Sequence, residues 1–179
     1  YSKFNEKDFD LFFNLIFKIY VIISLSILSL LTFFSEYLIL YIGGVNYIET
    51  RNLIFPICLS FVLLGLIEIL GIGIIIAKKT IYSLYSYFFY FITLIVLMYY
   101  FIKFYDILGI AWGLVIASFL LLSIEAIISH KVYKIKYEYF IVLLFSIFFI
   151  LLNIFLFYNP LFIISFYINY FLILIFNIL

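Results

Sequence analysis

Apolar runs of membrane-spanning length constrain this chain more than any other feature of its sequence. A helix that crosses the hydrocarbon core of a bilayer needs ~20 consecutive, mostly apolar residues. Six such runs follow one another, at about residues 11–33, 55–77, 81–102, 107–129, 139–158 and 161–179. In lipid every backbone polar group must be paired inside the chain, and helices meet that demand. We therefore predict an all-α integral membrane protein, with residues 1–179 as a single transmembrane region of about six helices.

The composition excludes a water-soluble domain. Hydrophobic residues form 70% of the chain and charged residues only 11%, whereas soluble domains contain ~45–50% apolar residues. That little polar surface cannot cover a folded domain in water, so membrane lipid is the expected partner of the helix surfaces. The formal net charge of +1 provides no strongly basic surface, and we exclude nucleic acid as a partner.

Short polar breaks separate the apolar runs. Ser35 is placed to cap a short helix over residues 36–42, and the Gly43-Gly44 pair is placed to end it. Pro56 falls in the first turn of the second run, where its missing N–H costs nothing. These breaks predict that the first and second runs form separate helices joined by a structured connection.

The basic residues of the breaks predict the orientation, because cytoplasmic loops carry an excess of Lys and Arg. If every run crosses the membrane, one side receives Lys3, Lys7, Lys78, Lys79, Lys131, Lys134 and Lys136. The opposite side receives only Arg51 and Lys103. This imbalance of seven to two places both termini in the cytoplasm and predicts a multi-pass protein of the cytoplasmic (inner) membrane.

Glu68 is the ionisable residue placed deepest in an apolar run. It lies 12 positions after Pro56 and 10 before Lys78, which is close to the middle of a bilayer. A charged group there costs at least ~2.5–3.5 kcal/mol, so the side chain should face a partner or a wet cavity. We take Glu68 as a candidate residue of a transport cavity. The alternative is a protonated carboxyl that joins two helices and has only a structural role.

Glu125 and Lys18 are weaker candidates for the same cavity. Glu125 lies five positions before His130 and six before Lys131, and it can extend to the interface and pair there. Lys18 lies about two turns into the first run and can extend to the cytoplasmic side. For both residues an interfacial, purely structural role is the competing interpretation.

Three small residues predict a close contact between helices. Gly109, Gly113 and Ala117 recur at intervals of four and so share one face of the fourth run. Small residues at this spacing allow the backbone of another helix to approach closely. We interpret them as helix-packing residues without a chemical role.

The sequence has no motif of a known enzyme class. Phosphate-binding, zinc-protease and serine-hydrolase patterns are all absent. The single histidine, His130, lies in a basic loop, and the single cysteine, Cys58, lies in an apolar run. We therefore expect no catalytic residues, no cofactor and no metal site, and we do not expect an enzyme.

Four stretches of the chain occur in a recognisable order. The stretch YSKFNEKDFD leads into the first run, and LILYIGGVNYIETRNLI follows, with Gly44 and Tyr47 before an apolar restart. LLGLIEILGIGIIIAKKT then ends in a basic turn, and YDILGIAWGLVIASFLLL opens a later run through Tyr105, Gly109 and Gly113. Over about residues 1–139, this order resembles the C-terminal portion of polysaccharide/O-antigen (oligosaccharide-lipid) flippases of the multidrug/oligosaccharidyl-lipid/polysaccharide exporter superfamily.

The resemblance implies two lobes of helices around a central cavity. It implies that an undecaprenyl-diphosphate-linked oligosaccharide crosses from the cytoplasmic to the outer leaflet by alternating access, for cell-surface polysaccharide biosynthesis. The implied partners are this lipid-linked glycan and the missing N-terminal lobe of the same protein. Since residue 1 is Tyr and not Met, we expect this chain to be a fragment, the trailing part of a flippase.

Other functional classes remain as alternatives. A multidrug/cation antiporter of the same superfamily would share the architecture. A membrane-embedded polysaccharide polymerase or acyltransferase needs a sizeable outer loop rich in Arg, His or acidic residues, whereas the loop over residues 34–54 contains only Glu36, Glu49 and Arg51. A non-catalytic membrane scaffold would leave Glu68 with a structural role.

Overall fold

A computed structural model describes residues 6–133 and the isolated residues 135, 137, 147 and 151, with side chains from residue 9 onward. Within residues 6–133 all regular elements are helical, which confirms the all-α class. In chain order they are α1 (Glu6–Phe33), α2 (Ser35–Ile42), the 3-10 helix η1 (Val45–Thr50), α3 (Arg51–Leu70), α4 (Ile72–Ile76) and α5 (Ile81–Val132).

Three helical segments of the described chain are long and apolar enough to cross a membrane, and not the six that the sequence predicted. They are Phe9–Phe33, Val45–Ile76 and Ile81–Val132. The predicted spans 139–158 and 161–179 lie outside the described residues, apart from Ile147 and Leu151. The predicted spans 81–102 and 107–129 both fall within α5, whose 52 residues include a reversal of direction.

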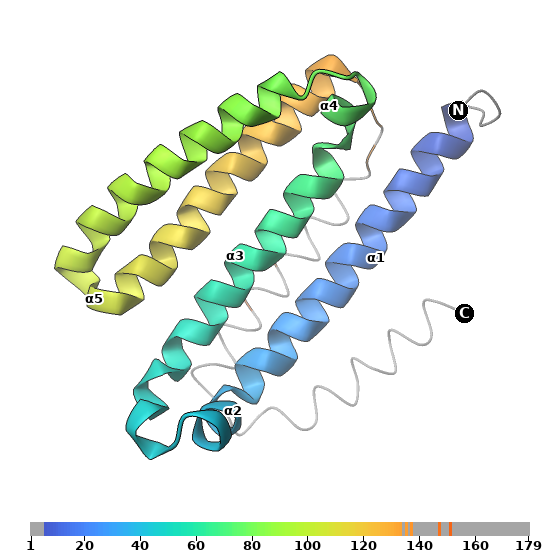
Figure 1. Ribbon diagram of the computed structural model, residues 1–179. Helices are drawn as coiled ribbons and strands as arrows, with labels where there is room; N and C mark the ends of the chain where they lie inside the picture. Colours follow the sequence, from blue (N-terminus) through green and yellow to red (C-terminus); the bar gives the residue numbers. More distant parts are fainter. Residues whose placement is uncertain (1–5, 134, 136, 138–146, 148–150, 152–179) are drawn as a thin grey trace, which may run out of the picture.

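The reversal in α5 occurs at Asp106. Its backbone angles, φ 51° and ψ −140°, are not helical, and two helices meet there. Figure 1 shows the chain turning back at this point, so that residues 81–105 and 107–132 form two antiparallel arms. A non-glycine residue at positive φ costs of the order of 1–3 kcal/mol, which the packing between the arms must offset.

The helix ends differ in two places from the sequence expectation. α3 begins at Arg51, so Pro56 lies inside the helix and not in its first turn. Ser35 is the first residue of α2 and makes no capping hydrogen bond; Phe34 occupies the capping position. The expected end of α2 is confirmed, because Gly43 follows its last residue and Gly44 takes φ 79°, a conformation that glycine adopts without strain.

The hydrophobic core lies along the contact between α1 and α3. Phe17, Val21, Leu25 and Leu28 form a buried stripe on α1, with the three- and four-residue spacing of one helix face. They pack with apolar residues of α3, and the second arm of α5 lies against the same cluster through Val115, Leu122 and Ala126. α3 is thus the central helix of the described bundle.

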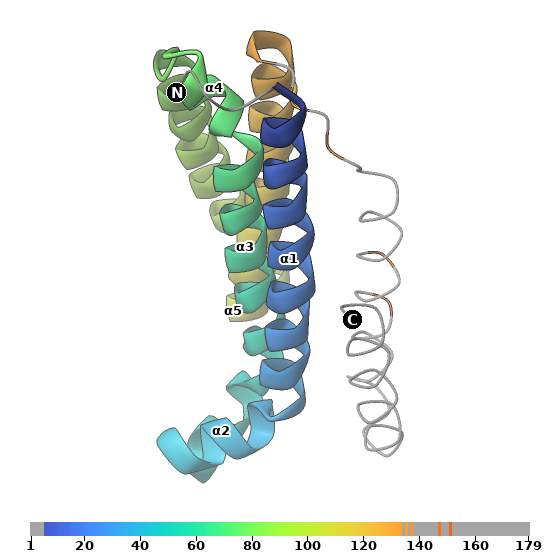
Figure 2. The same ribbon diagram turned by 90° about the vertical axis from the view of Figure 1, so that its right-hand side faces the viewer.

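The starts, ends and turns of the helices lie in two groups, one at each end of the bundle. Figure 1 shows the start of α1, helix α4 and the end of α5 at one end, and α2 with the turn of α5 at the other. Figure 2 shows that α1, α3 and α5 run along the long axis, while α2 lies across it. At the α2 end, Arg51 forms an ion pair with Glu36 at 2.6 Å, which ties α2 to the start of α3.

The outer surface of the described bundle is strongly apolar. Large side chains such as Leu84, Phe88 and Phe91 on the first arm of α5 are more than half exposed. Contiguous apolar surface of this extent is unfavourable in water and favourable against lipid tails. Together with the three candidate spans, it indicates a multi-pass helical membrane protein.

The two arms of α5 approach most closely at Gly109. A Cβ atom at this position would lie 2.7 Å from the backbone carbonyl carbon of Phe101. At Gly113, one turn further on, a Cβ atom would lie at an ordinary 3.6 Å from the Leu97 Cβ. Gly109 and Gly113 are both buried, as is Ala117 on the next turn. Of the two glycines, only Gly109 would bring a Cβ atom within 2.7 Å of the backbone of the other arm.

We predict that Gly109→Ala and Gly113→Ala have different effects on stability. Gly109→Ala forces the backbones of the arms apart and should lower the free energy of unfolding by about 1–3 kcal/mol. Gly113→Ala has room for its methyl group and should be neutral or slightly stabilising. Equilibrium unfolding of both variants in lipid nanodiscs measures the difference, and equal loss in the two would contradict the contact described here.

Candidate functional site

A cluster of polar side chains lies where α3 meets the two arms of α5. Glu68 projects from α3, and the Tyr87 hydroxyl on the first arm donates a hydrogen bond of 2.9 Å to its Oε1 atom. Both side chains are exposed on the surface of the described bundle. A carboxyl group therefore faces outward from a helix bundle whose surface is mostly apolar.

Glu125, on the second arm of α5, lies in the interior of the same cluster. Only 1% of its surface is exposed. The Ser83 hydroxyl donates a long hydrogen bond of 3.3 Å to its Oε2 atom, and its buried Oε1 atom has no hydrogen-bond partner in the structure. Gly71, at the break between α3 and α4, passes close enough that a Cβ there would lie 3.4 Å from Oε2.

The hairpin of α5 sets which residues of its arms face each other. Gly109 lies against Phe101 and Gly113 lies against Leu97, so each step along one arm matches a step back along the other. The same register, continued twelve residues beyond Gly113, brings Glu125 to the level between Ser83 and Ser86. Ser83 makes the hydrogen bond to Glu125, and Ser86 also lies beside this carboxyl.

Tyr87 connects the two carboxyl groups into one cluster. Ser83 and Tyr87 are four residues apart and so lie on one face of the first arm. Through this face, Glu68 and Glu125 are close enough to interact electrostatically with each other, and both interact with Tyr87. In the described part of the chain, neither carboxyl forms an ion pair with a basic side chain, since the ion pair found there joins Arg51 and Glu36.

Only two of the three residues that the sequence predicts for a transport cavity lie in this polar cluster. Glu68 and Glu125 come together in this cluster. Lys18 lies half-buried on α1 and takes no part in the Tyr87–Glu68 or the Ser83–Glu125 hydrogen bond. Glu125 is in the interior and does not extend to the interface. Tyr87 was missed, because nothing distinguishes it among the 18 tyrosines of the chain except its four-residue spacing from Ser83.

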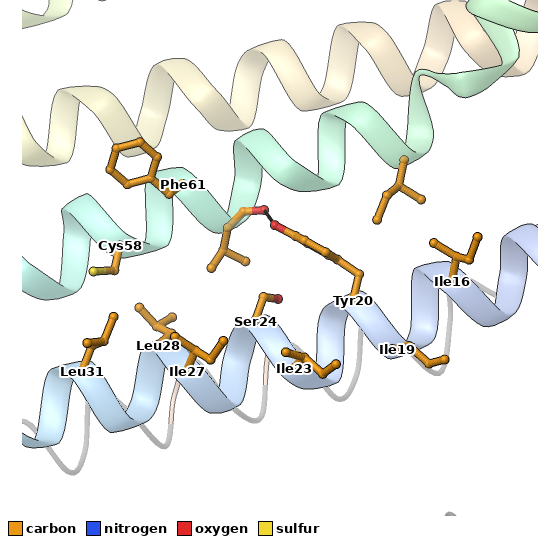
Figure 3. Close-up of a pocket in the computed structure, with 12 residues that line it drawn as sticks. Ile16, Ile19, Tyr20, Ile23, Ser24, Ile27, Leu28, Leu31, Cys58 and Phe61 are labelled. Atoms are coloured by element: carbon orange, nitrogen blue, oxygen red, sulfur yellow. Dashed lines mark hydrogen bonds between the residues drawn. The ribbon is translucent and has the colours of Figure 1, made fainter.

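A second feature is an apolar groove of about 630 Å³ between α1 and α3 (Figure 3). The Tyr20 side chain reaches from α1 across to α3, where its hydroxyl donates to the Val62 carbonyl oxygen at 3.0 Å. Gly65 makes room for this ring, because a Cβ there would lie 2.6 Å from the Tyr20 Cζ atom. The lining has no charged side chain, so the groove suits hydrocarbon and not an ionic headgroup.

Within the described residues, no group of three or more His, Cys, Asp or Glu side chains could hold a metal ion. The two carboxyl groups are therefore the chemically distinctive feature of this part of the chain. No family model, curated protein or solved structure matches this sequence.

We predict that the Tyr87–Glu68 hydrogen bond contributes modestly to stability. Tyr87→Phe keeps the ring and removes only the hydroxyl donor, so it should lower the free energy of unfolding by about 0.6–1.7 kcal/mol, the range of such bonds in membranes. Tyr85→Phe, on an exposed ring of the same arm, is the matched control and should have no effect. Unfolding in nanodiscs measures both variants, and equal values for the two would show that the bond does not form in the bilayer.

Proposed function

We propose that this chain is part of a membrane transporter that moves a lipid-linked oligosaccharide across the cytoplasmic membrane for cell-surface polysaccharide biosynthesis. The order of its sequence motifs resembles the C-terminal portion of polysaccharide flippases, and this resemblance supplies the substrate class. In this proposal the described helices form one side of a cavity. The N-terminal lobe of the longer protein forms the other side.

The outward-facing carboxyl of Glu68 carries the proposal. Glu68 and Tyr87 are exposed on the described bundle, within helices whose surface is mostly apolar. A carboxyl that faced lipid tails would cost at least ~2.5–3.5 kcal/mol. A polar, water-accessible surface beside α3 removes that cost, and a transport path for a glycan headgroup provides such a surface.

The orientation that we propose places both termini in the cytoplasm and includes six spans. It is supported by the separation of the basic segments in space. The loop with Lys78 and Lys79, between α4 and α5, lies at the same end of the bundle as the start of α1, and Lys103 precedes the turn at the opposite end. Lys131, in the last turn of α5, belongs to the first group.

A multidrug/cation antiporter of the same superfamily is the second candidate function. The observation that favours it is the pair of carboxyl groups, Glu68 and Glu125, which interact electrostatically within one cluster. Acidic groups attract cationic substrates as well as protons. Export of a cationic dye by cells that express the protein, without any effect on surface glycan, would favour this second function.

We predict that Glu68→Gln impairs glycan export without reducing the amount of protein in the membrane. Loss of a contact with a charged group corresponds to about 1.5–3 kcal/mol, so export should fall about tenfold or more. The measurement is surface polysaccharide in cells whose only copy of the protein carries the substitution. Glu49→Gln, a carboxyl-to-amide change on the exposed η1 segment, is the matched control.

The location of position 68 can be tested separately from transport. In a Cys58→Ser background, a single cysteine at position 68 should react with a membrane-impermeant thiol reagent, because the proposed cavity contains water. A cysteine in place of the lipid-facing Phe88 is the control and should not react. If position 68 is never reached from water in any state, or if export and protein level fall together in Glu68→Gln, the cavity role is excluded.

A further inference from the structure

We propose that Glu125 is the proton-binding group of a two-carboxyl site, and that the packed bundle holds this residue as the neutral acid. The inference does not depend on which substrate is transported, or on transport at all. It rests on the burial of Glu125, on its hydrogen bonds and on the groups that surround it.

An ionised Glu125 would be poorly compensated in this position. The Ser83 hydroxyl donates a long hydrogen bond of 3.3 Å to its Oε2 atom. The Ser86 hydroxyl also lies beside the carboxyl, but it donates a hydrogen bond to the Tyr82 carbonyl oxygen. The Glu125 Oε1 atom is buried and has no partner. A buried carboxylate is tolerated when cations or several well-aligned donors surround it, whereas here two neutral serine hydroxyls lie beside the group and one of them donates elsewhere. The neutral acid avoids the cost of a buried charge and gains an O–H donor of its own.

The side chains around Glu125 disfavour a second negative charge. The titratable groups that face the cluster are Glu68 from α3 and Tyr87 and Tyr90 from the first arm of α5. α4 has the sequence IGIII and contributes none, and α1 presents Tyr20, whose hydroxyl is bonded to the Val62 carbonyl oxygen. No basic side chain is among the groups that act on Glu125, and the ion pair in the described part of the chain joins Arg51 and Glu36.

The two carboxyl groups have different surroundings, which determines which of them keeps the proton. Glu68 is exposed, and its Oε1 atom accepts a hydrogen bond of 2.9 Å from Tyr87. Glu125 is 1% exposed and has an unpartnered oxygen, an arrangement that suits the neutral form. Of the two carboxyl groups, Glu125 is therefore the one that holds a proton in the packed bundle.

The enclosure of Glu125 selects a proton over a larger ion. The Oε1 atom is fully covered, and the backbone at Gly71, between α3 and α4, passes beside the Oε2 atom. A metal cation needs several oxygen ligands at 2.0–2.6 Å, and one hydroxyl at 3.3 Å does not supply them. Proton exchange with water then requires the contact between α3 and the arms of α5 to loosen, which couples the proton to the packing of these helices.

The test is the pH dependence of stability of the full chain in lipid nanodiscs. A glutamate in an unfolded chain loses its proton near pH 4.3, whereas Glu125 in the packed bundle keeps it. The folded state then binds one proton more than the unfolded state, so stability is greatest at low pH and falls as the pH rises. The folding equilibrium constant of the wild-type chain should fall about tenfold per pH unit from about pH 5 up to the pH at which Glu125 loses its proton in the folded state.

Glu125→Gln mimics the neutral acid and should remove this pH dependence while keeping the fold. Glu49→Gln should leave the dependence unchanged. Infrared spectra of the wild-type chain at neutral pH provide the second readout, because they should contain the band of a protonated, buried carboxyl that is absent in Glu125→Gln and retained in Glu68→Gln. A wild-type chain without this band, or a Glu125→Gln chain with the wild-type pH slope, would overturn the proposal.

Discussion

Three tyrosine hydroxyl groups converge on α3, and the arrangement of the described bundle depends on these contacts. Tyr20 of α1 donates to the Val62 carbonyl oxygen, and Tyr137, beyond the end of α5, donates to the Ile69 carbonyl oxygen. Tyr87 of α5 donates to the Glu68 carboxyl. In a bilayer the apolar side chains gain little from leaving lipid for protein, so close packing and hydrogen bonds hold the helices together. Each of these bonds fixes a different segment against the same central helix.

The small residues complement these hydrogen bonds. Gly65 provides the space into which the Tyr20 ring extends, and Gly109 lets the two arms of α5 touch through their backbones. The contact at Gly109 also fixes the register of the arms, which places Ser83 opposite Glu125. The polar cluster is therefore a consequence of the hairpin. A change of register by one residue would rotate Ser83 and Tyr87 away from the two carboxyl groups.

The sequence predicts the lengths of these helices better than the faces that they bury. α1 has a clear buried stripe, whereas α3 and α5 have apolar residues around most of their circumference, so periodicity does not indicate which side meets a neighbour. For this reason the sequence places both carboxyl groups within apolar runs but does not predict that Glu125 is buried and Glu68 exposed. The role of Gly44 in ending α2 was predictable, because the backbone conformation of a helix end depends on neighbouring residues. The hydrogen bond from Tyr87 to Glu68 was not predictable, because it joins residues 19 positions apart.

We propose that the first arm of α5 crosses the membrane, with the α4–α5 loop in the cytoplasm and the turn at Asp106 outside. Single cysteines in place of Lys79 and Lys103, two exposed lysines at opposite ends of this arm, test it directly in a Cys58→Ser background. In this orientation an impermeant thiol reagent labels position 103 in intact cells and position 79 only after the membrane is permeabilised. Labelling of both positions from the same side, or the reverse pattern, would contradict it.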